Sequence, residues 1–188
     1  MKRNLCVLAM LLVTAALAAG PALGCNYSYG TCWYGQTATI RGSDCADSIS
    51  GTSGSDIIDG LEMGDLIDGL EGDDYLCGGL GTDFIFGYTG RDRMNGDNDT
   101  VVGTWDKMFG ENGNDTMNGQ NGDDKMWGGP GDDFMQGGRN NDTVKGEDGN
   151  DHLEGNWDYD TVDGGLYYWD VCLWDAQDVF YSCEEYVY

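Results

Sequence analysis

Residues 110–136 read GENGNDTMN, GQNGDDKMW and GGPGDDFMQ, three consecutive nine-residue units of one pattern. Each unit begins with Gly, carries Asp at its sixth position and has a large apolar residue, here Met, at its eighth. Positions one to six are rich in Gly, Asn and Asp, which tolerate positive φ and favour tight turns. The last three positions leave room for a short strand, whose eighth side chain points to one side and whose seventh and ninth point to the other.

The same unit fills residues 42–163. It occurs twelve times in full, over residues 42–95 and 110–163, and residues 96–109 divide into two seven-residue units, GDNDTVV (96–102) and GTWDKMF (103–109). Tandem repeats of this kind are typical of solenoids, in which each unit buries its apolar side against its neighbours. We therefore expect an all-β fold, a right-handed parallel β-roll with two nonapeptides per coil and strands about 4.8 Å apart along its axis.

The apolar eighth positions form two inward columns in such a roll. With one seven-residue unit on each side, the first column contains Ile49, Ile67, Ile85, Val101, Met117, Met135 and Leu153. The second contains Ile58, Leu76, Met94, Met108, Met126, Val144 and Val162. Leu, Ile, Val and Phe make up only 26 of the residues after Gly24, about 16%. A highly charged chain with so few apolar residues is usually disordered, so this fold needs another source of stability.

The charge indicates what that source is. The chain has 34 acidic and 9 basic residues, a net charge of −25. Residues 1–24 have a basic start and an apolar run from Leu5 to Ala19, which predicts a secretory signal peptide cleaved before Cys25. Its removal leaves 7 − 34 = −27. This charge argues against nucleic-acid and anionic-membrane partners and favours cations, and no other segment is apolar enough to span a membrane.

The aspartates at position six are the candidate cation ligands. Because the turns stack, these side chains fall into two ladders of like charge that repel unless a cation lies between them. Carboxylate and carbonyl oxygens on a Gly-rich backbone suit the coordination of Ca²⁺ better than that of Mg²⁺. A zinc site is disfavoured, since the chain has one His and no CxxC motif.

The repeats resemble the GGxGxDxUx nonapeptide of the RTX (hemolysin-type) calcium-binding β-roll family. GGLGTDFIF (78–86) and GGPGDDFMQ (128–136) match it at every defined position, with Met as the large apolar residue. The resemblance implies calcium held between each turn and the turn two units later, with about eight ions in all. The implied ligands are Asp47, Asp56, Asp65, Asp74, Asp83, Asp92, Asp115, Asp124, Asp133, Asp142, Asp151 and Asp160.

Several turns depart from the family pattern. Cys45, Met63, Asn140 and Asp158 replace Gly at position four, and of these Met63 and Cys45 are the least suited to positive φ. The short units at 96–109 lack two turn residues each, so Asp99 and Asp106 are weaker ligand candidates. We expect the alternation of faces to survive the pair of short units.

The two ends of the mature chain do not follow the repeat. Residues 25–41 and 164–188 are rich in aromatic residues and contain four of the six mature cysteines, so we predict disulfide-fastened caps around the roll of residues 42–163. Within 164–188, Asp170 before Cys172 and Asp178 before Phe180 still follow the Asp-x-apolar order of the repeat. An aromatic carbohydrate-binding surface is the alternative interpretation of these ends.

We expect a secreted bacterial calcium-binding protein with a structural or adhesive role, monomeric and not an enzyme. Attachment through a lipid on Cys25 is the alternative to a free secreted form. An accessory module of a secreted hydrolase or toxin is an alternative function. Another is polysaccharide binding by a basic and aromatic strip, which on the predicted register comprises Arg93, Lys107, Phe109, Lys125, Trp127 and Lys145.

Overall fold

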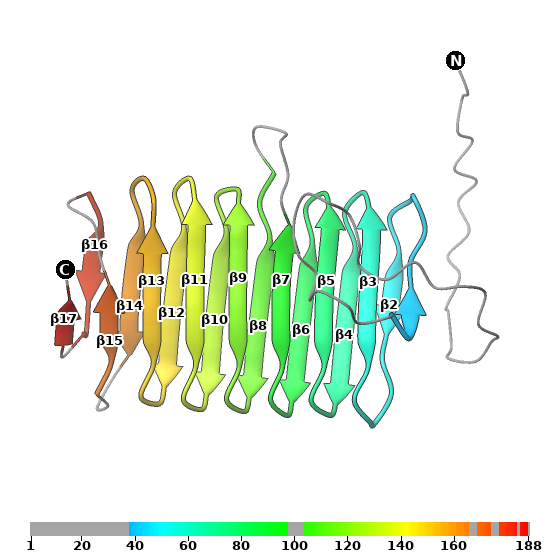
Figure 1. Cartoon of the computed structure of the whole chain (residues 1–188), viewed down its shortest axis with the longest axis horizontal. Helices are drawn as coiled ribbons and strands as arrows, with labels where there is room; N and C mark the ends of the chain where they lie inside the picture. The colour runs from blue at the N-terminus through cyan, green and yellow to red at the C-terminus, as the bar shows by residue number, and fades with distance from the viewer. Residues whose placement is uncertain (1–37, 98–103, 166–168, 174–176, 184, 188) are drawn as a thin grey trace, which may run out of the picture.

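The protein is a two-sheet parallel β-solenoid, seen here in a computed structural model that describes residues 38–97, 104–165, 169–173, 177–183 and 185–187. The described residues form strands and turns and no helix, and the coils stack along one long axis (Figure 1). None of these residues therefore belongs to a helix that could span a membrane. The predicted signal peptide (1–24) and residues 25–37 of the predicted N-terminal cap lie outside the described residues.

Every strand pairs in parallel with the strand two positions away in the chain, so the two sheets take alternate strands. The nine-stranded sheet contains β1 (Ile40–Arg41), β3 (Ile57–Glu62), β5 (Tyr75–Leu80), β7 (Arg93–Asp97), β9 (Thr116–Asn121), β11 (Phe134–Arg139), β13 (His152–Asn156), β15 (Val171–Leu173) and β17 (Glu185–Val187). The eight-stranded sheet contains β2 (Ser48–Ser50), β4 (Leu66–Glu71), β6 (Phe84–Thr89), β8 (Lys107–Asn112), β10 (Lys125–Pro130), β12 (Thr143–Asp148), β14 (Thr161–Gly165) and β16 (Val179–Tyr181).

The core lies between the two sheets and consists of two columns of single side chains. All of the predicted column residues that the structure describes are buried, and Cys172 and Cys183 extend the core toward the C-terminus. A thin core of this kind buries little apolar area per residue, so it supplies only part of the stability that the fold requires.

Residues 96–109 act as one long unit and not as two short ones, which corrects the predicted columns. β7 and β8 are consecutive among the described strands, and they lie in different sheets. Met108 therefore pairs with Ile85, and Met94 pairs with Met117, which exchanges the column membership of all later units. Val101, which we predicted in the first column, lies outside the described residues.

The strands are longer than predicted. Most contain six residues, because they continue from positions seven to nine into positions one to three of the next unit. The turn is confined to positions four to six. Positive φ recurs at positions two and four, which hold Gly in some units and other residues in the rest. Met63 adopts φ 76° even though its side chain suits this conformation poorly.

The correction at 96–109 also divides the predicted basic and aromatic strip. Arg93 lies on β7 in the nine-stranded sheet, opposite Tyr75, whereas Lys107 and Lys125 are paired in the other sheet. Arg93 is thus not on the same face as the lysines. Phe109 stacks on Trp127 with ring centroids 4.8 Å apart, and the stacked rings cover one another's faces.

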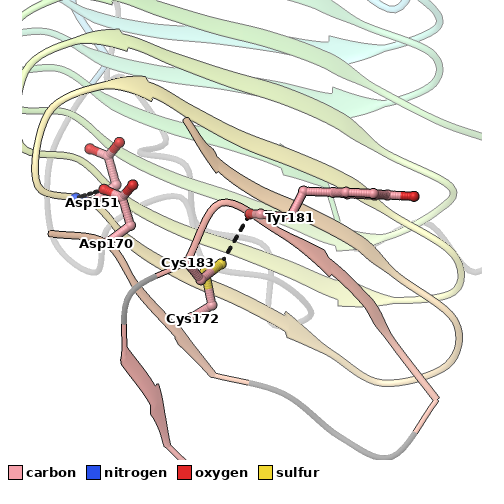
Figure 2. Close-up of a disulfide and its surroundings, with 5 residues drawn as sticks. All are labelled: Asp151, Asp170, Cys172, Tyr181 and Cys183. Atoms are coloured by element: carbon pink, nitrogen blue, oxygen red, sulfur yellow. Dashed lines mark hydrogen bonds between the residues drawn. A yellow bond between two sulfur atoms is a disulfide. The ribbon is translucent and has the colours of Figure 1, made fainter. Parts of the chain in front are cut away.

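The segment predicted as the C-terminal cap adds β15, β16 and β17 to the ends of the two sheets. Cys172 on β15 forms a disulfide with Cys183, which follows β16, and Cys183 Sγ also contacts the carbonyl oxygen of Tyr181 at 3.3 Å (Figure 2). The disulfide that we predicted for this end is confirmed. Cys45 and Cys77 each take part in a disulfide as well.

Candidate metal centre

The position-six aspartates form two continuous ladders, one along each edge where the turns lead into a sheet. Each Asp directly precedes a strand, and the backbone of the following residue pairs with the Asp of the previous coil, as in Phe134 N–H to Asp115 O at 2.9 Å. One ladder contains Asp47, Asp65, Asp83, Asp106, Asp124, Asp142, Asp160 and Asp178. The other contains Asp56, Asp74, Asp92, Asp115, Asp133, Asp151 and Asp170.

In every ladder Asp except the first of each ladder, Asp47 and Asp56, one carboxylate oxygen, Oδ1, is used to build the ladder. It accepts a hydrogen bond from the backbone N–H of the Asp in the preceding coil, as Asp133 Oδ1 does from Asp115 at 2.8 Å. The same bond joins Asp151 N–H to Asp170 Oδ1 at 3.0 Å, near the disulfide (Figure 2). This bond fixes the carboxylates in register along the axis.

The second oxygen, Oδ2, is buried without a protein donor at most of these positions. This holds for Asp65, Asp74, Asp92, Asp115, Asp124, Asp133, Asp142 and Asp151. A buried carboxylate oxygen that lacks a donor loses its hydration with nothing in return, which costs several kcal/mol unless a cation or a proton replaces the water. Each ladder therefore contains a series of buried carboxylates that favour binding of a cation or a proton.

Glycine at position one creates the space beside Oδ2. A Cβ placed on Gly119 would lie 2.5 Å from Asp124 Oδ2 and 2.6 Å from the carbonyl oxygen of Gly137 in the next coil. The carboxylate and a backbone carbonyl thus converge on the side of the chain where a side chain is absent. The requirement for Gly at this position is steric, since no positive φ is involved at Gly119.

The first two turns differ from the rest. Asp47 Oδ2 accepts hydrogen bonds from Ser43 N–H at 2.6 Å and Ser43 Oγ at 2.8 Å. Asp56 Oδ2 accepts the equivalent bonds from Thr52 at 2.6 Å and 2.8 Å. A hydroxyl residue at position two therefore satisfies the carboxylate without a metal, and Asp47 and Asp56 are the weakest of the predicted ligands on this geometry.

Burial raises the pKa of the carboxyl groups in the middle of the ladders well above the ordinary Asp value of 3.8. Loss of hydration is the main cause, repulsion by neighbouring carboxylates adds to it, and the hydrogen bond from the preceding coil opposes it. The pKa rises to about 6 for Asp92 and Asp124, about 7 for Asp65, Asp74, Asp115 and Asp151, about 8 for Asp133 and about 9 for Asp142. In the metal-free protein, Asp133 and Asp142 are therefore largely protonated at neutral pH, whereas Asp92 and Asp124 take up protons only below it.

All twelve predicted ligand aspartates lie in the two ladders, but those after residues 96–109 lie in the opposite ladder to the one that the predicted columns imply. Three further aspartates join the ladders. Asp106, which we considered a weak candidate, is buried, and its Oδ1 accepts from Asp83 N–H at 2.8 Å. Asp170 and Asp178 continue the ladders into the C-terminal segment. The Asp-x-apolar order at Asp170 and Asp178 indicated in the sequence that the repeat continues into this segment. Asp99 lies outside the described residues.

The donor set fits calcium. Within the described residues, no three His, Cys, Asp or Glu side chains gather around one point, so carboxylates alone do not form a complete site. Carboxylate oxygens together with carbonyl oxygens of the neighbouring turn form a hard-oxygen donor set, which Ca²⁺ prefers and which Zn²⁺ does not. Bound calcium would supply the positive charge that Oδ2 lacks.

Comparison with known protein families agrees with this geometry. A model of the RTX calcium-binding nonapeptide repeat matches residues 38–62, 50–85, 68–102, 103–135 and 136–166, which together span about two thirds of the chain. The protein belongs to the RTX calcium-binding repeat family. A comparison of this RTX protein with individual curated proteins gives no significant match. The family assignment establishes it as a calcium-binding structural repeat protein.

Proposed function

We propose that this RTX protein is secreted unfolded or partly folded and acquires its solenoid when it binds calcium outside the cell. The observation that carries the proposal is the pair of ladders in which buried Oδ2 atoms have no protein donor. Eight divalent ions would change the mature charge from −27 to about −11, which removes much of the repulsion that opposes compaction. Ions that bind only the folded state also stabilise it by mass action.

The individual ligands belong to this proposal. We assign the ions to the turns whose Oδ2 atoms lack a donor, with Asp106 in place of Asp99 across the long unit. Asp47 and Asp56 are expected to contribute least, because Ser43 and Thr52 already serve them. Direct counting of bound calcium in the mature protein by equilibrium dialysis tests the assignment. A count of two ions or fewer would contradict it.

The role that we propose is structural or adhesive and not enzymatic. The repeats use nearly all of their polar turn residues to build the ladders, which favours a rigid scaffold that presents two sheet faces. The test compares adhesion of the protein to cells and to extracellular matrix in millimolar calcium and in chelator. Adhesion that requires calcium supports the proposal, whereas a hydrolase activity lost on a single substitution would contradict it.

A further inference from the structure

A shallow groove of about 390 Å³ lies on the outer face of the nine-stranded sheet, over β9, β11 and β13. These strands are neighbours in the sheet and are drawn side by side in yellow-green to orange in Figure 1. The groove is separate from the aspartate ladders, because its lining residues occupy positions two, three and nine of their units.

Gly138 lines the groove between two amide residues. It pairs with Gln120 on one side and with Asn156 on the other, and it adds no side chain of its own between their amides. Asn118 and Gln136 at position nine form one wall. Five of the eight lining residues therefore carry carboxamides, which both donate and accept hydrogen bonds.

Two of these amides are held in place by neighbours. Gln136 Nε2 donates to Glu154 Oε2 at 2.7 Å, and Gln120 Nε2 donates to Asn95 Oδ1. Groups fixed in this way lose little side-chain entropy when they bind a ligand, which favours binding.

The opposite wall contains a tryptophan and an arginine that pack together. The guanidinium carbon of Arg139 lies 4.6 Å from the centroid of the Trp157 ring, and the backbone N–H of Trp157 donates to the carbonyl oxygen of Gly138 at 3.0 Å. The Trp157 side chain is 59% exposed. A guanidinium that stacks through its face keeps its N–H groups in the plane, where they can bind a carboxylate with two hydrogen bonds.

The charge of the groove contrasts with that of the protein. Among the described residues that line it none is acidic and one is Arg, although the whole chain has 34 acidic residues against 9 basic ones. Carboxamides matched to hydroxyl groups, an indole beside them and one guanidinium suit a sugar that carries a carboxylate. A peptide ligand would need apolar pockets for its side chains, and the lining contains no aliphatic side chain.

We propose that this groove binds an acidic oligosaccharide, with Arg139 on the carboxylate, Trp157 against the sugar ring and the amides on the hydroxyl groups. The inference rests on the calcium-loaded fold proposed above, because the groove is formed by three adjacent coils. It adds a ligand class and a place on the molecule that the calcium ladders do not provide.

Calorimetric titration of the mature protein in millimolar calcium tests the proposal, with a hyaluronan hexasaccharide as the acidic probe and chitohexaose as the neutral one. We expect Arg139→Gln to weaken binding of the acidic sugar at least tenfold and to affect the neutral sugar little. Trp157→Ala should weaken binding of both. The matched controls are Arg91→Gln, at an exposed Arg in a turn, and Trp169→Ala, at a Trp that is 77% exposed.

The outcomes separate this proposal from the calcium proposal. Circular dichroism and calcium titration of each variant should match the wild type, so that lost sugar binding cannot be attributed to lost folding. The proposal is overturned if the wild type binds neither sugar at millimolar concentration, or if Arg139→Gln and Trp157→Ala bind like their controls. Equal or tighter binding of a hexaglutamate peptide would also overturn it and would assign the groove to acidic peptides.

Discussion

Replacing Asp133 with Asn should have opposite effects with and without calcium. The substitution keeps the shape of the side chain and an oxygen to accept from Asp115 N–H, but it removes the charge at the buried Oδ2. In the metal-free protein this relieves an unfavourable burial. In the calcium-loaded protein it removes a ligand.

The magnitude follows from the pKa of Asp133, which burial raises from 3.8 to about 8. A pH of 7 is about 3 units above the ordinary Asp pKa and is still below the raised pKa of Asp133. Since each unit corresponds to about 1.4 kcal/mol, the burial of Asp133 costs the metal-free fold at most about 4 kcal/mol. With calcium at 100 times its dissociation constant, the loss of one site costs about 2.7 kcal/mol.

The assay measures folding in two conditions. In EGTA, trimethylamine N-oxide is added to drive folding. The osmolyte concentration at which half of the protein is folded should be lower for Asp133→Asn than for the wild type. In saturating calcium, urea unfolding should show a lower free energy of unfolding. The control is Asp148→Asn, which removes one charge from an exposed side chain outside the two ladders. Destabilisation in both conditions would refute the reasoning, because it would make the carboxylate an ordinary stabilising hydrogen-bond acceptor.

Four further predictions follow from the same geometry. The raised pKa values mean that the folded, metal-free protein binds more protons than the unfolded chain. Without calcium, its stability should therefore be highest below about pH 4 and should fall as the pH rises through 6 to 9. Circular dichroism in EGTA across this range checks the prediction, and stability that rises with pH would contradict it. Gly119→Ala should destabilise the calcium-loaded roll by about 2 kcal/mol or more because its Cβ meets two oxygens, whereas Gly54→Ala, whose Cβ meets nothing within 4 Å, should leave urea unfolding unchanged. Cys172→Ser should lower the free energy of unfolding by about 3 kcal/mol through loss of a disulfide with a sequence separation of 11, and an equal midpoint under oxidising and reducing conditions would argue against this. Asp106→Asn should reduce the number of calcium ions measured by dialysis, and an unchanged number would remove Asp106 from the ligand set.

The repeat pattern was sufficient to predict the solenoid, because position six and position eight alternate with strict spacing over twelve units. Side-chain periodicity of this kind specifies register directly, so the partners of Ile58 and Met126 followed from counting. The aspartate ladders followed for the same reason, except that the long unit exchanges their later members.

The long unit could not be predicted by counting alone. Its fourteen residues can be counted as two short units or as one long unit, and only the pairing of Met108 with Ile85 distinguishes the two counts. That ambiguity produced the errors in the columns and in the placement of Arg93. The hydrogen bonds from Ser43 and Thr52 were also missed, because the sequence alone does not give the orientation of the peptide at position two.

The most direct test of the account is the far-UV circular dichroism of the mature protein, recorded at neutral pH in millimolar calcium and again after addition of excess EGTA. We expect a β-rich spectrum with calcium, a largely disordered one in chelator, and full recovery when calcium is restored. Magnesium at the same concentration should not restore the β-rich spectrum. A spectrum that remains β-rich in EGTA would contradict calcium-driven folding.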